Sequence, residues 1–414
     1  MSQRSAASIG ASLLVATLAL TACGSRGGDT TSSTSGSTGS GSAAAGTKTA
    51  KIGVIAPLSG DLAALGLGIQ NSVDLAIKQA NDSNAIPGWK LELAAQDDQA
   101  TADVGKNAAT KLAGDKDVIG VVGTLNSSVS LQVQPVLASA NIVQVSPANT
   151  GVSLTAGEDA ANPKRPFATY FRTCTTDAVQ GPFAARYLFE TAGIKEVATV
   201  HDKKAYGQGL VAAFTAEFEK LGGKIVAAET INPDEDKYDA VVSAIKPKAP
   251  KAVYYGGEYP QGAPLSQQMK AAGLNIPLMG GDGLYDGKFI ELAGSESAGD
   301  LATSVGAPTD STDAGKTFLK QYEEAGYDDP SAAYGGYSYD AANAIINALK
   351  VSLKDASSVE EARKATVDAL GKVSFDGVTG KVAFDELGDT TTKVLTVYKV
   401  TDGAWKPENT AEFK

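Results

Sequence analysis

Four polar loops in this sequence contain residue types that could bind a small charged molecule. Two of them, Gly123–Ser128 and Val145–Thr150, follow apolar strand-like runs and are rich in hydroxyl groups. Hydroxyl groups and free backbone N–H groups at the start of a helix favour the binding of a carboxylate. The alternative is ordinary N-capping, in which Ser127 or Ser128 only closes the start of the following helix.

The other two loops each place an acid among small residues. They are Gly256–Pro260, which contains Glu258, and Gly280–Gly283, which contains Asp282. All four loops follow predicted strands, and open α/β sheets bind ligands at the carboxyl ends of their strands. Carboxylate-binding groups in one part of the chain and acids in another would together hold the two ends of a zwitterion.

Little in the sequence favours catalysis. His201 is the single histidine, so any Ser-His-Asp or Cys-His mechanism would depend on it. It ends the apolar run VATVH, where a structural role or a place at the edge of a pocket is expected. No G-x-S-x-G motif is present, and the segment Gly66–Ile69 lacks the third glycine of a dinucleotide fingerprint. An exported hydrolase with His201 as base is the enzymatic alternative.

The clustered acids of the chain do not predict a metal site. Asp97-Asp98 and Asp234-Glu235-Asp236 lack the ligand spacing and the bending glycine of a calcium loop. We expect both clusters to be solvated loop ends. The sequence therefore predicts no metal and no cofactor.

The first fifty residues predict export. Arg4 supplies a positive start, residues 9–20 are apolar or small, and Leu20-Thr21-Ala22-Cys23 follows at once. This is a secretory signal with a small-residue cleavage site before a cysteine, and the apolar run is too short to remain as a membrane span. The pattern resembles the bacterial lipoprotein signal, which implies cleavage before Cys23 and a two-chain lipid on its sulfur. The alternative is a plain signal peptide with an accidental cysteine.

The segment after Cys23 predicts a flexible tether, since residues 24–49 are almost entirely Gly, Ser, Thr and Ala. We therefore expect a signal peptide at 1–22 and a lipidated tether at 23–49. The mature protein would be extracytoplasmic and anchored by lipid to the outer face of a bacterial cell membrane.

The composition of the remaining chain predicts a soluble globular body. The net charge of −11 is spread along the sequence, which argues against binding to nucleic acid. Cys174 is the only cysteine besides Cys23, so no internal disulfide can form. We expect Cys174 to be a small buried residue.

Short β-rich runs alternate with amphipathic helical patterns from residue 50 onward. This alternation predicts an α/β fold with parallel sheets covered on both faces, and its length exceeds one sheet. Helical patterns without clear strands follow residue 306, including one over residues 359–370, and strand-like segments over residues 375–384 and 394–400 close the chain. We predict two doubly wound lobes joined by a hinge that the chain crosses several times. The first lobe comprises residues 50–175 plus 306–384, and the second comprises residues 176–305 plus 385–414.

Several motifs together carry a family resemblance. They are Ile52–Gly60, Ser146–Ala148 with Thr150, His201–Lys203 with Tyr206–Gly209, Tyr254–Gly257 and Tyr339–Ala341. From about Lys51 to Phe384 the chain resembles the Leu/Ile/Val-binding proteins of bacterial ABC importers, which have the type I periplasmic binding protein fold. The resemblance implies a monomeric binding protein that delivers a branched-chain or similar small amino acid to a membrane permease driven by a cytoplasmic ATPase. It implies no enzyme activity.

The resemblance also implies which residues hold the charged ends of the ligand. Ser127, the backbone of Ala148 and Thr150 would bind the α-carboxylate from the first lobe. Asp282 would pair with the α-ammonium from the second lobe. The charged ends of the ligand and the Asp282 carboxylate must have hydrogen-bond partners for all their polar atoms when they are buried in a closed cleft.

Four further residues would shape the pocket. Tyr206 would line the cleft, and Tyr334 would pack against the ligand side chain. Leu65 stands where the family often has an aromatic residue, and Glu258 stands where a tyrosine is common. Glu258 would share the ammonium or select a ligand with an extra positive charge or a hydroxyl. An alternative function on the same fold is a ligand sensor that reports to a membrane receptor.

Overall fold

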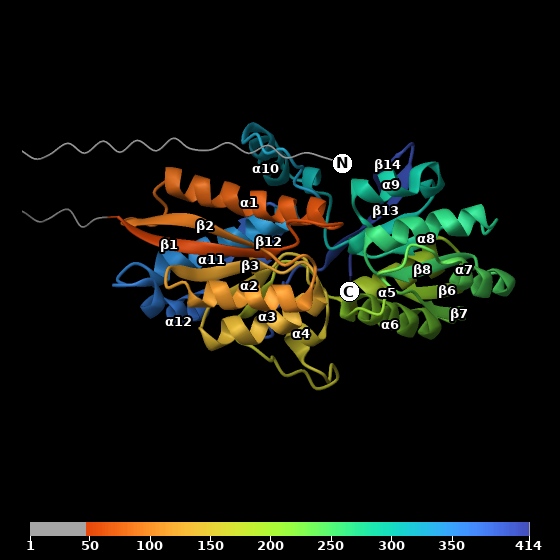
Figure 1. Ribbon diagram of the computed structural model, residues 1–414, viewed down its shortest axis with the longest axis horizontal. Helices are drawn as coiled ribbons and strands as arrows, with labels where there is room; N and C mark the ends of the chain where they lie inside the picture. Colours follow the sequence, from red (N-terminus) through yellow and green to blue (C-terminus); the bar gives the residue numbers. More distant parts are fainter. Residues whose placement is uncertain (1–46, 414) are drawn as a thin grey trace, which may run out of the picture. The chain divides into compact units, whose positions relative to one another are not determined.

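Two separate β-sheets, each covered by helices, organise residues 47–413, the part of the chain that the computed structural model describes (Figure 1). We call the part built on the five-stranded sheet the first lobe and the part built on the seven-stranded sheet the second lobe. The predicted α/β fold class is confirmed. The predicted signal peptide, Cys23 and most of the tether lie outside the described residues.

The sheet of the first lobe is entirely parallel, in the order β2-β1-β3-β4-β5. Its strands are β1 (Lys48–Ala56), β2 (Trp89–Asp97), β3 (Val118–Gly123), β4 (Val143–Ser146) and β5 (Tyr170–Arg172). The central strands β3 and β4 are buried along their whole length, as expected for a parallel sheet with both faces covered. β1 begins two residues before the predicted start of this lobe.

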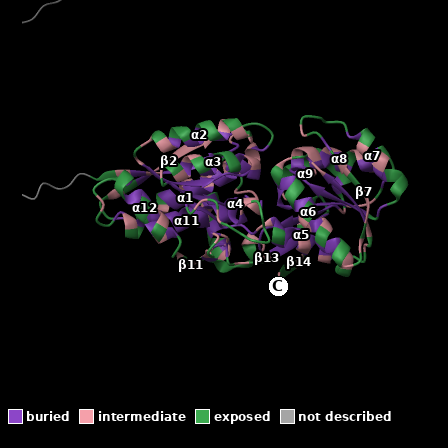
Figure 2. Ribbon diagram, turned by 90° about the horizontal axis from the view of Figure 1, so that it is seen from below, coloured by how far each residue is buried: buried purple, intermediate pink, exposed green. Residues whose placement is uncertain are grey.

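Helices cover both faces of the first sheet. One face is covered by α1 (Ala63–Asp82), α11 (Gly335–Ser352) and α12 (Val359–Leu370), and the other by α2 (Ala102–Gly114) and α3 (Ser127–Ser139). The short helix α4 (Ser153–Ala156) contacts α3, and helix α10 (Asp313–Glu324) packs against Leu75 of α1 through Phe318 and Tyr322. Figure 2 shows the buried residues gathered at the strands and the inward helix faces.

The sheet of the second lobe is mixed, in the order β14-β13-β10-β9-β8-β6-β7. Its strands are β6 (Glu196–His201), β7 (Lys224–Thr230), β8 (Ala252–Gly256), β9 (Leu278–Gly280), β10 (Leu301–Ser304), β13 (Val394–Thr401) and β14 (Ala404–Glu412). β13 runs antiparallel to both β10 and β14, which differs from the purely parallel expectation. The antiparallel pair β13–β14 is joined by a tight hairpin at Asp402-Gly403, whose positive φ angles of 53° and 71° suit a two-residue turn.

The second sheet is also covered on both faces. Helices α5 (Asp177–Arg186) and α6 (Ala205–Lys220) pack together on one face. Helices α7 (Asp239–Ile245), α8 (Tyr259–Ala271) and α9 (Gly287–Ala293) pack on the other. No helix among residues 47–413 is both long and apolar enough to cross a membrane.

The chain passes between the lobes at three places, which confirms the predicted hinge with several crossings. The crossings lie between β5 and α5, between β10 and α10, and between the small hairpin β11 (Ser374–Gly377) and β12 (Gly380–Ala383) and strand β13. Asp340, from one of the family-like motifs, holds that hairpin: its carboxylate accepts from the backbone N–H groups of Val378 and Thr379, each at 2.9 Å. Its role here is structural.

Candidate functional site

One small cavity between the lobes brings together residues from all four predicted loops. It is lined by Leu125, Asn126, Ser127, Ala148, Tyr206, Glu258, Asp282, Gly283 and Tyr334. Most of the predicted ligand residues are in this set; Thr150 and Leu65 are not. Leu65 is fully buried in the core of the first lobe, on α1. We call this space the central cavity.

The first-lobe wall of the central cavity contains the N-terminus of α3. Asn126 is the N-cap residue, and no side chain of the described residues caps this helix. Ser127 is its first residue, and its Oγ instead accepts a hydrogen bond from the N–H of Gly151 at 3.2 Å. Neither Ser127 nor Ser128 therefore caps α3 through its side chain, as the N-capping alternative would require. An uncapped helix N-terminus carries partial positive charge and attracts an anion.

The neighbouring loop is ordered by Ser146. Its Oγ donates to the carbonyl of Thr124 at 2.9 Å and accepts from the backbone N–H of Ala148 at 3.2 Å. This places Ala148 on the cavity wall with its N–H directed towards Ser146. Thr150, further along the loop, is fully buried behind the wall, and its Oγ1 has no hydrogen-bond partner among the described residues.

The second-lobe wall is dominated by Asp282, which is only 2% exposed. Its Oδ1 accepts from Tyr206 Oη at 2.8 Å and from Gln180 Nε2 at 2.9 Å, and its Oδ2 accepts from Tyr334 Oη at 2.8 Å. Burial raises the pKa of this carboxyl, and the three donors partly offset that rise. No lysine or arginine lines the central cavity within residues 47–413. Asp282 thus has neutral donors and no cationic partner.

Glycine is required beside this acid. A Cβ on Gly281 would lie 2.4 Å from Tyr206 Oη and 2.6 Å from Leu210 Cδ2, so a larger residue would displace a donor of Asp282. A Cβ on Gly207 would lie 2.4 Å from the carbonyl oxygen of Gly256. The start of α6 therefore packs directly against the end of β8, which brings Tyr206 to the same cavity as Glu258.

Glu258, the second acid of the cavity, has its charge paired within the protein. Its Oε1 accepts from Asn126 Nδ2 at 2.7 Å, and its Oε2 accepts from Lys204 Nζ at 3.0 Å. Lys204 also lies 3.9 Å from Asp202, whose pKa is raised to about 7 by burial and by the charge of Glu258. A carboxylate with these two donors does not require a cation from the ligand.

Two hydrogen bonds join the lobes across the central cavity. Tyr334 donates to Asp282, and Asn126 donates to Glu258; in each pair the donor belongs to the first lobe and the acid to the second. The cavity that remains measures about 10 Å³, close to the space of a single water molecule. An amino acid can enter only if these residues separate.

The chain matches the Periplasmic binding protein family over residues 49–404. It belongs to that family. The family consists of solute-binding proteins and not of enzymes, in agreement with the predicted absence of catalysis.

Curated relatives cover most of this periplasmic binding protein. It is 32% identical to the Leu/Ile/Val-binding protein BraC3 of Rhizobium johnstonii over 348 residues, which are 84% of this chain and 90% of the relative. It is 31% identical to Leu/Ile/Val-binding protein homolog 1 of Brucella abortus over 353 residues, covering 85% and 91%. The predicted family resemblance is confirmed.

Solved structures of similar proteins have the same fold. The leucine-binding protein LivK of Thermotoga maritima gives a TM-score of 0.78 at 25% identity, covering 88% of this chain and 99% of LivK. The branched-chain amino acid binding protein LivJ of Streptococcus pneumoniae, solved with isoleucine, gives 0.77 at 26% identity, covering 88% and 99%.

Other predicted features of the periplasmic binding protein have structural roles. Cys174 is fully buried and unpaired, as expected, and burial raises the pKa of its thiol. His201 ends β6 and is partly buried, and its Nδ1 accepts from the N–H of Lys203 at 3.1 Å. The prediction that Asp97-Asp98 is a solvated loop end is wrong for Asp98, which is fully buried and has a pKa raised to about 7 by burial. Residues 234–236 are exposed, as predicted.

Three residues of the site were not assigned roles from the sequence. Gln180 donates to Asp282 from α5 and accepts from its N–H at 2.9 Å. Lys204 and Asn126 bind Glu258. The position of Asn126 at the start of a predicted helix could have suggested a polar role, but no local pattern marks Gln180 or Lys204 as partners of distant acids.

A buried acid lies behind the central cavity. Asp177, the first residue of α5, is fully buried, and neither carboxylate oxygen has a hydrogen-bond partner among the described residues. Burial raises the pKa of Asp177 to about 7; the charge of Asp282 adds to this rise, and the Thr150 hydroxyl opposes it. Two acids therefore lie close together on the second-lobe side of the site.

Proposed function

We propose that this protein is the extracytoplasmic solute-binding lipoprotein of an ABC importer. It captures a branched-chain or similar small amino acid between its lobes and delivers it to a membrane permease that a cytoplasmic ATPase drives. The observation that carries the proposal is the pairing, in one cavity, of a buried carboxylate without a cationic partner and an uncapped helix N-terminus.

The ligand ammonium binds Asp282. A buried carboxylate is stabilised most by a charge-assisted hydrogen bond, and the neutral donors Tyr206, Gln180 and Tyr334 supply less of this stabilisation than a cation does. The ammonium takes the place of the Tyr334 hydroxyl at Oδ2, because that donor belongs to the other lobe and moves away when the lobes separate.

The ligand carboxylate binds the first lobe. The N-terminus of α3 offers backbone N–H groups and the Ser127 hydroxyl on the cavity wall, and Ala148 lies beside them. Thr150 contributes through its hydroxyl, which lies beside Asp177, once the loop adjusts to the ligand. These groups together satisfy an anion without using a charged side chain.

The ligand side chain is neutral. Glu258 is already paired with Lys204 and Asn126, so it does not select a cationic side chain. Leu125 and the ring of Tyr334 give the cavity an apolar wall. The relatives named as Leu/Ile/Val-binding proteins, and LivJ with its bound isoleucine, support an aliphatic ligand.

Ligand binding closes the lobes about the three crossing segments. We place the lobe boundaries at 50–175 plus 306–384 and at 176–305 plus 385–414, with the protein acting as a monomer. A ligand that contacts both lobes binds the closed form more tightly than the open form, and this difference in affinity shifts the protein towards the closed form. The permease then recognises the closed form, and a lipid on Cys23 keeps the protein near it.

A thermal-shift screen of the full chain against the twenty amino acids tests this proposal. A ligand that binds only the native state raises the melting temperature by mass action. We expect Leu, Ile and Val to raise it and Lys, Arg, Asp and Glu to leave it unchanged. A response restricted to charged amino acids would overturn the side-chain assignment, and no response to any amino acid would overturn the ligand class.

A further inference from the structure

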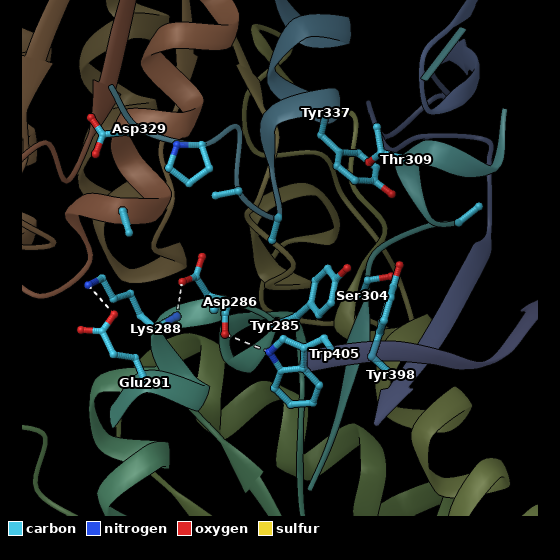
Figure 3. A pocket seen from close by; sticks show the side chains of 16 residues that line it. Tyr285, Asp286, Lys288, Glu291, Ser304, Thr309, Asp329, Tyr337, Tyr398 and Trp405 are labelled. Atoms are coloured by element: carbon cyan, nitrogen blue, oxygen red, sulfur yellow. Dashed lines mark hydrogen bonds and ion pairs between the residues drawn. The ribbon is translucent and has the colours of Figure 1, made fainter. Parts of the chain in front are cut away.

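A second and much larger cavity lies between the lobes, beside the central cavity. Its volume is about 630 Å³, within the range of small-molecule sites. The first lobe contributes Ala64 from α1 and Ala333 and Tyr337 around the start of α11, and the second lobe contributes Tyr285 and Trp405, among others (Figure 3). We call it the aromatic cavity.

Four aromatic side chains form the walls of the aromatic cavity: Tyr285, Tyr337, Tyr398 and Trp405. The rings of Tyr285 and Tyr398 stack with centroids 4.0 Å apart, and Tyr285 meets Trp405 edge-on at 6.1 Å. Trp405 is fixed by a hydrogen bond from its Nε1 to the carbonyl of Asp286 at 2.9 Å. The rings are thus held by one another and by the backbone, in the manner of a preformed binding surface.

The charge of the aromatic cavity is negative. Asp286, Glu291 and Asp329 line it, and the lining cation Lys288 is bound to Glu291 at 2.7 Å. Asp286 lies on the cavity wall beside Tyr285 and Trp405 (Figure 3). Its Oδ1 accepts from the N–H of Lys288 at 2.8 Å, and no ion pair with a basic side chain is found for it in the described part of the chain. Burial raises the pKa of Asp286, the N–H and the charge of Lys288 oppose part of that rise, and a bound cation would oppose it further.

We propose that the aromatic cavity is a second ligand site, which binds a small organic ammonium ion such as an arylalkylamine. The ammonium group pairs with Asp286, and the apolar part of the ligand lies among Tyr285, Tyr398 and Trp405. Aromatic faces attract organic cations, and a carboxylate among them adds a charge-assisted hydrogen bond. The ligand needs no carboxylate of its own, which separates it chemically from the ligand of the central cavity.

This site is coupled to the opening of the lobes. A cation in the aromatic cavity contacts Tyr337 and Ala333 of the first lobe and Tyr285 of the second, so it favours the closed arrangement. Tyr285 follows Asp282 by three residues, and Ala333 precedes Tyr334 by one. The two cavities therefore share the segments that form the Tyr334–Asp282 hydrogen bond.

Isothermal titration of the full chain with phenethylammonium tests the proposal. We expect wild type to bind phenethylammonium more tightly than 2-phenylethanol, its neutral analogue.

Asp286→Asn keeps the acceptor that caps α9 and should weaken phenethylammonium binding at least about tenfold. Trp405→Leu should weaken it similarly, with its folding checked by thermal melting. Asp402→Asn makes the same chemical change at an exposed ion pair and should alter binding less than about twofold.

The Asp282→Asn variant distinguishes the two cavities. If phenethylammonium occupies the aromatic cavity, Asp282→Asn weakens its binding by less than Asp286→Asn does, because Asp282→Asn acts only through lobe closure, while amino-acid binding is lost. The proposal is overturned if wild type does not bind phenethylammonium, if 2-phenylethanol binds equally well, or if Asp282→Asn abolishes binding that Asp286→Asn preserves. A failure of amino-acid binding alone would contradict the proposed function and leave this test unaffected.

Discussion

The hydroxyl of Tyr334 donates to Oδ2 of Asp282 at 2.8 Å, across the boundary between the lobes. Tyr334 immediately precedes α11 on the first sheet, and Asp282 follows β9 of the second. The acid proposed for the ligand ammonium is therefore bound by a group that separates from it when the lobes open. Closure of the lobes therefore adds a third donor to Asp282, which keeps the hydrogen bonds from Tyr206 and Gln180 of its own lobe.

A double-mutant cycle should measure the Tyr334–Asp282 bond. Tyr334→Phe should lower the free energy of unfolding by about 1–3 kcal/mol, because it removes a donor to a buried acid. Combined with Asp282→Asn, it should show a coupling energy of about 0.5–3 kcal/mol in urea denaturation. Tyr322→Phe is the matched control, since its hydroxyl donates to the carbonyl of Asp329 instead. Strictly additive effects of Tyr334→Phe and Asp282→Asn would contradict the bond.

Removing the partner of Glu258 should change ligand selectivity. In Lys204→Met the Glu258 carboxylate keeps only the Asn126 amide, so a cationic ligand side chain becomes favourable. We expect the ratio of lysine to leucine affinity, measured by calorimetry, to rise at least about tenfold. The double variant Lys204→Met/Glu258→Gln should return the ratio to that of wild type. If the ratio is unchanged in Lys204→Met, the pairing of Glu258 does not determine selectivity.

The buried acid Asp177 should make stability depend on pH. Its folded pKa of about 7 exceeds the ordinary value of 3.8, so the folded state holds this proton more tightly than the unfolded state. The resulting stability is fully present below about pH 4 and is lost as pH rises through 7. Asp177→Asn stays neutral, so its free energy of unfolding relative to wild type should be about 3 kcal/mol larger at pH 8 than at pH 5.

Denaturation of wild type and Asp177→Asn at both pH values checks this prediction. Asp98 and Asp202 also have pKa values raised to about 7, so some pH dependence should remain in the variant. An equal effect of Asp177→Asn at pH 5 and pH 8 would show that its carboxyl does not titrate in this range.

The lipid anchor predicts a simple change in localisation. Cys23→Ser removes the sulfur that the proposed lipid occupies, so the protein should leave the membrane fraction while its ligand affinity stays the same. Fractionation of cells followed by immunoblotting measures the first result, and calorimetry measures the second. Cys174→Ser is the matched control, because it changes the other cysteine without touching the proposed anchor. Continued membrane association of Cys23→Ser would refute the anchor.

Much of the fold could be predicted because its local patterns agree with its tertiary structure. Helix α12 begins and ends at the same residues as the helical pattern predicted over 359–370. Strands β3 and β4 are the continuous apolar runs expected of buried parallel strands. The sequence pattern does not predict strand β14, because residues 404–412 are mostly exposed and have no apolar alternation. The Asp402-Gly403 pair was the available signal for its hairpin.

The positions of the site loops follow from the fold, but the partners of their side chains do not. Strand ends of one parallel sheet converge, so Ser127 and Ala148, which follow the neighbouring strands β3 and β4, could be expected at one site. Gln180 lies 102 residues from Asp282 and Asn126 lies 132 residues from Glu258, so packing alone decides those bonds. For the same reason the burial of Asp98 could not be read from its acidic neighbourhood.

Calorimetry with leucine and two truncated analogues tests the central claim most directly. Isoamylammonium lacks the carboxylate that the α3 N-terminus binds, and 4-methylpentanoate lacks the ammonium that Asp282 binds. The measurement uses Asp286→Asn, which removes the acid proposed for organic ammonium ions in the aromatic cavity. Leucine should bind this variant, and each analogue should bind it at least about 100-fold more weakly, because each leaves one buried group unpaired. Equal affinity for leucine and either analogue would contradict the proposal that the cavity holds both ends of a zwitterion.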